Sequence, residues 1–213
     1  TIQFVKDEKK KNRIAKETME IYAPLADRMG MNRIRDELED LSFSVLNKPA
    51  RDLIIERLKY IKNNREDTFK SISVELIQLL KKNGINANIT GREKTPFSIW
   101  RKIQNKKISL EQLTDIIGFR IIVKNIEDCY KTLGIFHSKF STIPGKFKDY
   151  ISTPKINKYK SIHTSVIGPK KNRIEIQIRT FDMNEFAERG IASHWKYKSS
   201  EKFSELSWKE YDW

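Results

Sequence analysis

The sequence has a single cysteine, Cys129, among its 213 residues. One cysteine excludes an internal disulfide framework and a metal site built from clustered cysteines. No apolar run approaches the roughly 18 residues that a membrane helix requires, and the N-terminal residues lack a signal-peptide pattern. These absences predict a protein of the reducing cytoplasm without membrane contact. The first residue is Thr1 rather than Met, which suggests a piece of a longer protein.

Negative charge is scarce, and the formal net charge is +14 at pH 7. Residues 84–164 hold 15 Lys and Arg against 6 Asp and Glu, so most of the excess lies in the middle of the chain. At its end, residues 145–164 carry five lysines interleaved with two tyrosines, an asparagine and a histidine. Because lysines pair with phosphates and aromatic rings stack on bases, this basic segment predicts a nucleotide or nucleic-acid partner. A plain solvated loop has the same composition.

Helical periodicity prevails in the first 83 residues, with Gly30 as the expected end of the first helix. We expect helices over residues 6–30 and 32–46. A third helical region, from Pro49 to Asn83, either continues through Asn63–Asn64 or breaks there. The apolar stripes of these helices predict core packing.

After Gly84 the pattern alternates between strands and helices. In the last expected strand, Glu175, Gln177 and Arg179 share one face, which is either a plain solvent face or the floor of a cleft. We expect strands over residues 85–89, 115–123, 161–167 and 173–179, and helices from residue 96, over 127–140 and over 182–198.

The start of the helix at residue 96 forms a candidate phosphate site. Thr95 is a suitable N-cap, and the positive end of the helix dipole favours an anion. Arg92, Lys94, Ser98 and Lys102 can face that anion together. The spacing is not that of a Walker loop, and an ordinary basic helix face would contain the same residues.

Asp115 stands at the start of the expected central strand. A carboxylate there is a good Mg²⁺ ligand when phosphates supply further oxygens. The alternative is a carboxylate that only caps the element.

Five motifs in order resemble the synthetase domain of the RelA/SpoT family of alarmone synthetases. They are GREKxPxSIxRK at 91–102, DxxGFR at 115–120, KFKDYIxxPKxNxYxSIHT at 146–164, EIQIRT at 175–180 and AExGIAxHWxYK at 187–198. Residues 14–46 resemble the linker helices that precede this domain in long, bifunctional-type members.

The resemblance implies an α+β fold: a nucleotidyltransferase-like mixed β-sheet flanked by helices and preceded by a helical linker region. It divides the chain into a linker region (1–48), a synthetase domain (49–198) and a C-terminal helical tail (199–213). The implied reaction transfers the β,γ-pyrophosphate of ATP to the ribose 3′-hydroxyl of GDP or GTP and releases AMP.

The resemblance also implies roles for individual residues. ATP is held by Arg92, Lys94, Ser98 and Lys102. Mg²⁺ is bound by Asp115 and Glu175, and Glu175 with Gln177 beside it activates the 3′-hydroxyl. GDP or GTP is held by Tyr159, which stacks on guanine, and by Lys148, Lys155, Asn157 and His163.

The sequence departs from the family in three places. Lys146 stands where Arg is usual, and Lys158 and Lys160 replace the usual Gly and Gln around Tyr159, which is expected to stiffen the loop and to change the preference between GDP and GTP. None of the three histidines is followed by Asp, so the His-Asp pair of the family's hydrolase is absent and we expect no ppGpp hydrolysis.

Two other functions remain open at this point. One is an RNA-directed pyrophosphokinase that acts on tRNA 3′ ends, which a basic surface would suit. The other is a catalytically inactive nucleotide-sensing module. Contact with the ribosome or tRNA as partners is otherwise expected only through regulatory regions that this sequence lacks.

Overall fold

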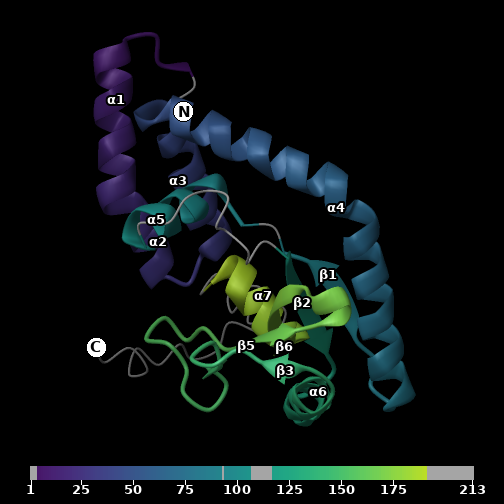
Figure 1. The fold of residues 1–213 in the computed structure, drawn as a ribbon. Coiled ribbons are helices and arrows are strands. Elements are labelled where there is room, and N and C mark those ends of the chain that lie inside the picture. The colour runs from purple at the N-terminus through teal and green to yellow at the C-terminus, as the bar shows by residue number, and fades with distance from the viewer. Residues whose placement is uncertain (1–3, 93, 107–116, 191–213) are drawn as a thin grey trace, which may run out of the picture.

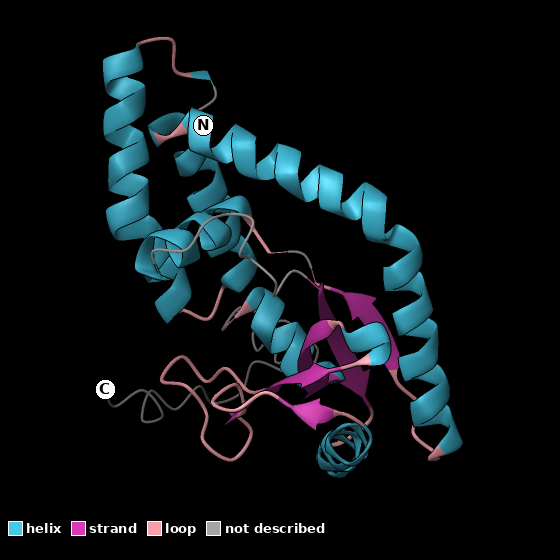
Figure 2. Cartoon of the chain, in the orientation of Figure 1, coloured by secondary structure: helices cyan, strands magenta, loops and turns pink. Residues whose placement is uncertain are grey.

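A computed structural model describes residues 4–92, 94–106 and 117–190 of the chain (Figure 1). Its centre is a six-stranded mixed sheet, and a group of helices lies beyond one end of it (Figure 2). The helical elements are α1 (Glu8–Glu17), the π-helical turn η2 (Thr18–Tyr22), α2 (Ala23–Arg28), α3 (Asn32–Leu46), α4 (Lys48–Lys82), α5 (Pro96–Lys106), α6 (Ile126–Lys139), the 3₁₀ turn η3 (Pro169–Lys171) and α7 (Phe181–Arg189). The strands are β1 (Asn88–Gly91), β2 (Ile117–Val123), β3 (Ser141–Thr142), β4 (Lys148–Asp149), β5 (Ile162–Ile167) and β6 (Arg173–Thr180).

The strand order in the sheet is β1-β2-β6-β5-β3, and β4 pairs with β5. The β2–β6 pair is parallel, whereas the other pairs are antiparallel. The predicted α+β class with a mixed sheet flanked by helices is therefore confirmed.

The two faces of the sheet differ in polarity. Ile174, Ile176 and Ile178 of β6 point to one face and are fully buried. The C-terminal half of α4 and the buried side of α6 pack on this face, so it forms the main hydrophobic core. The opposite face carries the polar side chains of β6, because successive residues of a strand point to opposite sides.

Helix α4 runs without a break for 35 residues, so the open question at Asn63–Asn64 is answered in favour of one helix. Its two halves pack in different places. Ile54 belongs to a small cluster with Phe43 of α3 and Ile99 of α5, whereas Ile72 and Leu76 belong to the main core. Packing at both ends stabilises the polar middle of the helix.

The N-terminal helical run ends at Gly30, which has a φ of +70°. Helix α3 then begins at Asn32 and ends at Leu46, as predicted. Its Phe43 packs edge-on against Phe97 of α5, with ring centroids 5.5 Å apart. This contact joins the N-terminal helices to the helix that begins beside β1.

One strand lies later than predicted. The expected strand 85–89 is instead Asn88–Gly91, because Ile85 is buried against the end of α4 before pairing with β2 begins. The last helix was predicted over 182–198, but it ends at Arg189, because Gly190 has a φ of +61°. Residues 191–198 and the tail 199–213 lie outside the described residues. Among the helices that are described, none is long and apolar enough to span a membrane.

Candidate active site

The strand register aligns the polar side chains of the sheet in rows. Gln177 of β6 lies opposite Arg120 of β2 on one side and His163 of β5 on the other. Lys148 of β4 lies opposite His163 and extends the row. Gln177 is buried, with 5% of its surface exposed, and Arg179 two residues on is 2% exposed. The polar face of β6 is therefore a covered floor and not a plain solvent face.

Glu175 is the acidic group of this floor. Its Oε2 lies 2.7 Å from Lys94 Nζ, and its Oε1 lies 4.0 Å from Arg92 Nη1. Burial alone would raise the pKa of Glu175, but the Lys94 ammonium and the Arg92 guanidinium outweigh burial and hold this pKa below its ordinary value. Glu175 is therefore ionised at neutral pH and held between two cations.

Backbone contacts place these cations beside the floor. The Arg92 N–H donates to the Gly118 carbonyl of β2 at 2.8 Å, so the chain after β1 stays close to the central strand. A Cβ on Gly118 would lie 3.2 Å from the Arg92 carbonyl, which explains why the DxxGFR motif has glycine at this position. The sequence predicted Arg92, Lys94 and Glu175 as site residues. Their proximity depends on the register of the sheet, which the sequence did not predict.

The predicted cap at the start of α5 is formed. The Ser98 N–H donates to Thr95 Oγ1 at 3.3 Å, and Ser98 Oγ donates to the Thr95 carbonyl at 2.9 Å. The Ser98 oxygen retains its lone pairs, and Lys102 follows one turn later on the same face.

Three rings and an ammonium group form a cluster over the end of β5. Tyr159 Oη and His163 Nε2 are 2.9 Å apart, and the Tyr150 ring meets both rings edge-on. Lys155 Nζ lies 5.0 Å from the Tyr150 centroid and 5.3 Å from that of Tyr159, in cation–π contact. Tyr159 is only partly buried, so its ring lies at the surface of the site and outside the hydrophobic interior.

His163 is neutral at physiological pH. Burial lowers the pKa of His163 to about 4; Glu175 opposes this shift, and Arg92, Lys155 and Arg179 add to it. A neutral imidazole bonded to a phenol can take only one of the two donor–acceptor arrangements at a time. The hydrogen bond ties the Tyr159 hydroxyl to His163 in either arrangement.

Asn157 uses its amide within the protein. Its Nδ2 donates to the Asp27 carbonyl at 3.0 Å, and its Oδ1 accepts from the Tyr159 N–H at 3.2 Å. Asn157 thus links the last turn of α2 to the aromatic cluster.

Two arginines of the floor and Glu188 of α7 were not among the predicted site residues. Arg120 Nη1 and Arg179 Nη2 both approach Glu188 Oε1 of α7, at 2.9 and 3.9 Å. Burial lowers the pKa of Arg179 to about 10; the positive charges of Arg120 and Arg92 add to this shift, whereas Glu188 opposes it. Both arginine Nε atoms are buried and have no hydrogen-bond partner among the described residues. The alternation of β6 places Arg179 on the same face as Glu175 and Gln177, so the sequence predicted its side of the sheet. Its ion pair with Glu188 could not be predicted from the neighbouring sequence.

An open cavity of about 950 Å³ adjoins the aromatic cluster at the starts of α6 and α7. Four lysines line it: Lys124, Lys155, Lys158 and Lys160. Glu127 and Asp182 also line it, so positive charge prevails by two. This excess suits a polyanion next to the rings.

Asp115 lies outside the described residues, so its predicted place beside Glu175 stays a prediction. Within the described ranges, no group of three or more His, Cys, Asp or Glu side chains that could hold a metal ion is found. Glu175 is the one predicted metal ligand that the structure describes.

A family profile described as "Region found in RelA / SpoT proteins" matches residues 91–202. Among curated relatives, the GTP pyrophosphokinase rsh of Brucella melitensis biotype 1 is 50% identical over 191 residues, which is 90% of this chain and 26% of the relative. A protein of Aquifex aeolicus named guanosine-3′,5′-bis(diphosphate) 3′-pyrophosphohydrolase is 47% identical over 207 residues, 97% of this chain and 30% of the relative. The chain thus spans about a quarter to a third of the length of these relatives.

Two solved structures are similar in fold. Small alarmone synthetase 1 from Bacillus subtilis superposes with a TM-score of 0.51 at 26% identity, covering 70% of this chain and 83% of that chain. The same protein bound to its product pppGpp gives a TM-score of 0.50 at 27% identity, covering 69% of this chain and 84% of that chain.

Proposed function

The chain belongs to the RelA/SpoT family, and from this premise we propose that it is a (p)ppGpp synthetase. The reaction is transfer of the β,γ-pyrophosphate of ATP to the ribose 3′-hydroxyl of GDP or GTP, with release of AMP. The observation that carries the proposal is the ionised Glu175 on a covered polar floor, 2.7 Å from Lys94 and beside the ring cluster of Tyr159. The relatives named GTP pyrophosphokinase support the same activity.

ATP occupies the side of the floor next to α5. Arg92 and Lys94 take its phosphates, and Ser98 and Lys102 continue the contact along the first turns of the helix. Phosphoryl transfer depends mainly on in-line positioning and on neutralising the spread of negative charge. A set of cations at a helix start provides both.

The acceptor nucleotide occupies the other side. Guanine stacks on Tyr159, whose hydroxyl is hydrogen-bonded to His163. Lys148 and Lys155 neutralise the acceptor's phosphates, and Asn157 keeps the backbone at Tyr159 in place. The pppGpp-bound structure of the Bacillus relative supports a guanosine polyphosphate as the ligand.

Glu175 is the general base for the 3′-hydroxyl, and arrival of ATP strengthens it. In the ligand-free protein Lys94 lies against Glu175, but a phosphate oxygen competes for the same ammonium group. When Lys94 turns to phosphate, Glu175 loses one of the two cations that hold its pKa below the ordinary value. A carboxylate of higher pKa accepts the hydroxyl proton more readily, and Gln177 beside it orients the ribose.

Mg²⁺ is the proposed cofactor, with Asp115 and Glu175 as its protein ligands. One or two carboxylates completed by substrate phosphates is a usual Mg²⁺ environment, and Glu175 fits that donor set. When bound, the ion neutralises charge on the phosphate oxygens. We propose that the chain works in the cytoplasm and does not hydrolyse ppGpp, since no histidine is followed by the aspartate of the hydrolase pair.

The proposal is tested by product separation. The protein is incubated with ATP labelled at the γ-phosphate, Mg²⁺ and GDP or GTP; AMP and a labelled guanosine 3′-diphosphate are expected. Glu175→Gln is expected to lower kcat by about 10²- to 10⁴-fold and to retain ATP binding.

Glu185→Gln is the matched control, because Glu185 forms an ion pair with Arg189 on α7 and is not one of the proposed site residues. This variant is expected to keep full activity. Label found only on added tRNA, or full activity in Glu175→Gln, would contradict the proposal.

A further inference from the structure

The segment that carries the acceptor residues packs on itself mainly through Tyr150, Tyr159 and Lys155. Residues 150–161, the acceptor loop, connect β4 to β5, and Lys155, Ile156, Lys158 and Lys160 are exposed. Inside the loop, the Lys158 N–H donates to the Lys155 carbonyl at 2.8 Å. Such a loop needs contacts with another element to hold one conformation.

The last turn of α2 supplies one such contact. The Asp27 carbonyl accepts the Asn157 amide, from a position 130 residues away in the sequence. Arg35 of α3 binds the Asp27 carboxylate, with Nη1 and Oδ1 2.5 Å apart, and so fixes Asp27 to α3. The loop is therefore attached to α3 through two polar contacts in series.

The backbone at Gly30 packs directly on the same loop. A Cβ on Gly30 would lie 3.3 Å from the Asn157 carbonyl oxygen and 3.4 Å from Gly190 Cα. A Cβ on Gly190 would lie 2.4 Å from the Met29 carbonyl. Both glycines have positive φ, so three backbone segments meet where side chains have no room.

Asn32, the first residue of α3, completes this junction. Its Nδ2 donates at 2.8 Å to the Ala187 carbonyl, one of the last carbonyls of α7 that lack a partner within the helix. The same helix α7 carries Glu188, which pairs with the arginines of the floor.

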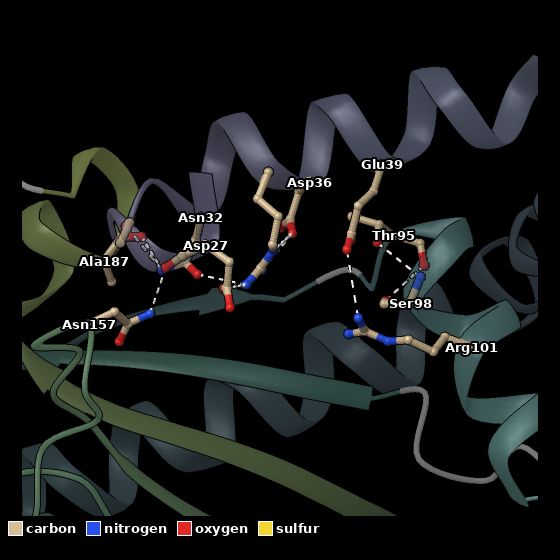
Figure 3. Close-up of polar contacts among 11 residues, drawn as sticks. Asp27, Asn32, Asp36, Glu39, Thr95, Ser98, Arg101, Asn157 and Ala187 are labelled. Atoms are coloured by element: carbon tan, nitrogen blue, oxygen red, sulfur yellow. Dashed lines mark hydrogen bonds and ion pairs between the residues drawn. The ribbon is translucent and has the colours of Figure 1, made fainter. Parts of the chain in front are cut away.

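Further along, α3 contacts the helix proposed to hold ATP. Glu39 is 7% exposed, and its Oε1 lies 3.7 Å from Arg101 Nη1 of α5. Phe43 packs against Phe97 and Trp100 of α5. Figure 3 shows both junctions along α3: Asn157 and Ala187 near Asp27 and Asn32 at one end, and Arg101 facing Glu39 at the other.

We propose that α3, together with the end of α2 and the turn between them, acts as a strut that sets the position of the acceptor site relative to the ATP site. Its N-terminal end positions the acceptor loop through Asn157, and its middle positions α5 through Glu39. Asp27, Gly30, Asn32 and Glu39 are positioning residues, because each acts through another residue. The inference rests on the proposed function, since it assigns the two sides of the floor to two nucleotides.

If α3 acts as this strut, a substitution at one of its ends is expected to change the KM of one substrate and not of the other. Gly30→Ala and Asn32→Ala are expected to raise the KM for GDP about tenfold and to change the KM for ATP less than twofold. Glu39→Gln removes the attraction to Arg101 and keeps the side-chain size. It is expected to raise the KM for ATP several-fold and to leave the KM for GDP unchanged. Glu37→Gln, an exposed change on the same helix, is the matched control and keeps both constants.

A second measurement does not depend on activity. Amide hydrogen exchange at Lys158 and Tyr159, both donors inside the acceptor loop, is expected to quicken in Gly30→Ala and Asn32→Ala and not in Glu39→Gln. If the wild type makes no product, the proposed function fails, and exchange still tests the strut.

Two outcomes would overturn the inference. One is an equal rise of both KM values in every variant together with a lower Tm, which is what a merely structural role produces. The other is unchanged loop exchange in both Gly30→Ala and Asn32→Ala.

Discussion

Lys158 has a φ of +59°, in the left-handed region that glycine adopts more easily. The RelA/SpoT resemblance places glycine at this position, so the chain retains a lysine where the backbone disfavours one. A left-handed non-glycine residue costs on the order of 1 kcal/mol. Lys158 lines the cavity beside the acceptor loop, so its strained backbone places a positively charged residue next to the proposed acceptor site.

Replacing Lys158 by glycine removes both the backbone strain and the positive charge. Lys158→Gly is expected to raise the free energy of unfolding by about 0.5 kcal/mol, because relief of strain exceeds the added flexibility of the unfolded chain. It is expected to weaken GTP more than GDP, since GTP brings more negative charge to the cavity. Urea unfolding and the two KM values measure these effects.

Lys160→Gln is the control, because Lys160 also lines the cavity but has no positive φ. It should weaken GTP without a gain in stability. A loss of stability in Lys158→Gly would contradict the strain argument.

For individual residues, the sequence predicted those site residues that belong to local motifs. Arg92, Lys94 and Glu175 were predicted as site residues, and the structure brings them together. Glu188 was missed because its role depends on α7 crossing the floor, which no spacing along the chain encodes. The contact of Asn157 with Asp27 was also invisible, since it joins two segments through a backbone carbonyl.

At the scale of elements, helix α4 packs closely against strand β1 at Gly91. A Cβ on Gly91 would lie 2.4 Å from Phe69 Cζ of α4. Phe69 in turn stacks on Phe119 of β2, with ring centroids 4.6 Å apart, so the Phe69 ring has little freedom to move aside. The glycine that opens the GREK motif is thus explained by helix–strand packing, and Arg92 follows it directly.

Gly91→Ala is therefore expected to destabilise the protein by about 1–3 kcal/mol through overpacking. It should also raise the KM for ATP, because a shift of β1 displaces Arg92. Thermal unfolding and ATP kinetics test both effects.

Gly134→Ala is the matched change, since a Cβ there meets nothing within 4 Å. On a helix it should stabilise by about 0.5–1 kcal/mol and leave ATP kinetics unchanged. Equal Tm values for Gly91→Ala and the wild type would refute the packing argument.

The sequence predicted helices and strands well where the apolar periodicity extends over many residues. It predicted the ends of these elements less well. The bounds of α3 follow from its pattern and from Gly30, and the strand pair β5–β6 follows from alternation. The start of β1 could not be predicted, because Ile85 is buried by α4 and not by the strand ladder. The continuity of α4 depends on two separate clusters at its ends, which local sequence does not reveal.

The stability of the whole molecule should fall in mild acid because of His163. The unfolded chain binds a proton there near pH 6.5, whereas the folded protein resists protonation until about pH 4. The unfolded state therefore holds more protons between these values, and stability is full above pH 6.5 and lost as the pH falls toward 4. Between pH 7.5 and pH 5 the loss is about 2 kcal/mol.

His163→Asn should remove most of this dependence, as measured by urea unfolding at the two pH values. The lowered pKa values of Glu175 and Asp149 act in the same direction but at lower pH, where carboxylates titrate. Parallel pH slopes for the variant and the wild type would show that another group is responsible.

The cluster of Phe43, Ile54 and Ile99 has a consequence for how this chain can be divided. The family resemblance suggested a border at residue 48, between linker and synthetase. That border falls between Phe43 and Ile54, so a cut there would expose apolar side chains of α4 and α5 to water. A shortened version of this protein therefore needs α3, or another apolar surface in its place, to keep α4 and α5 packed.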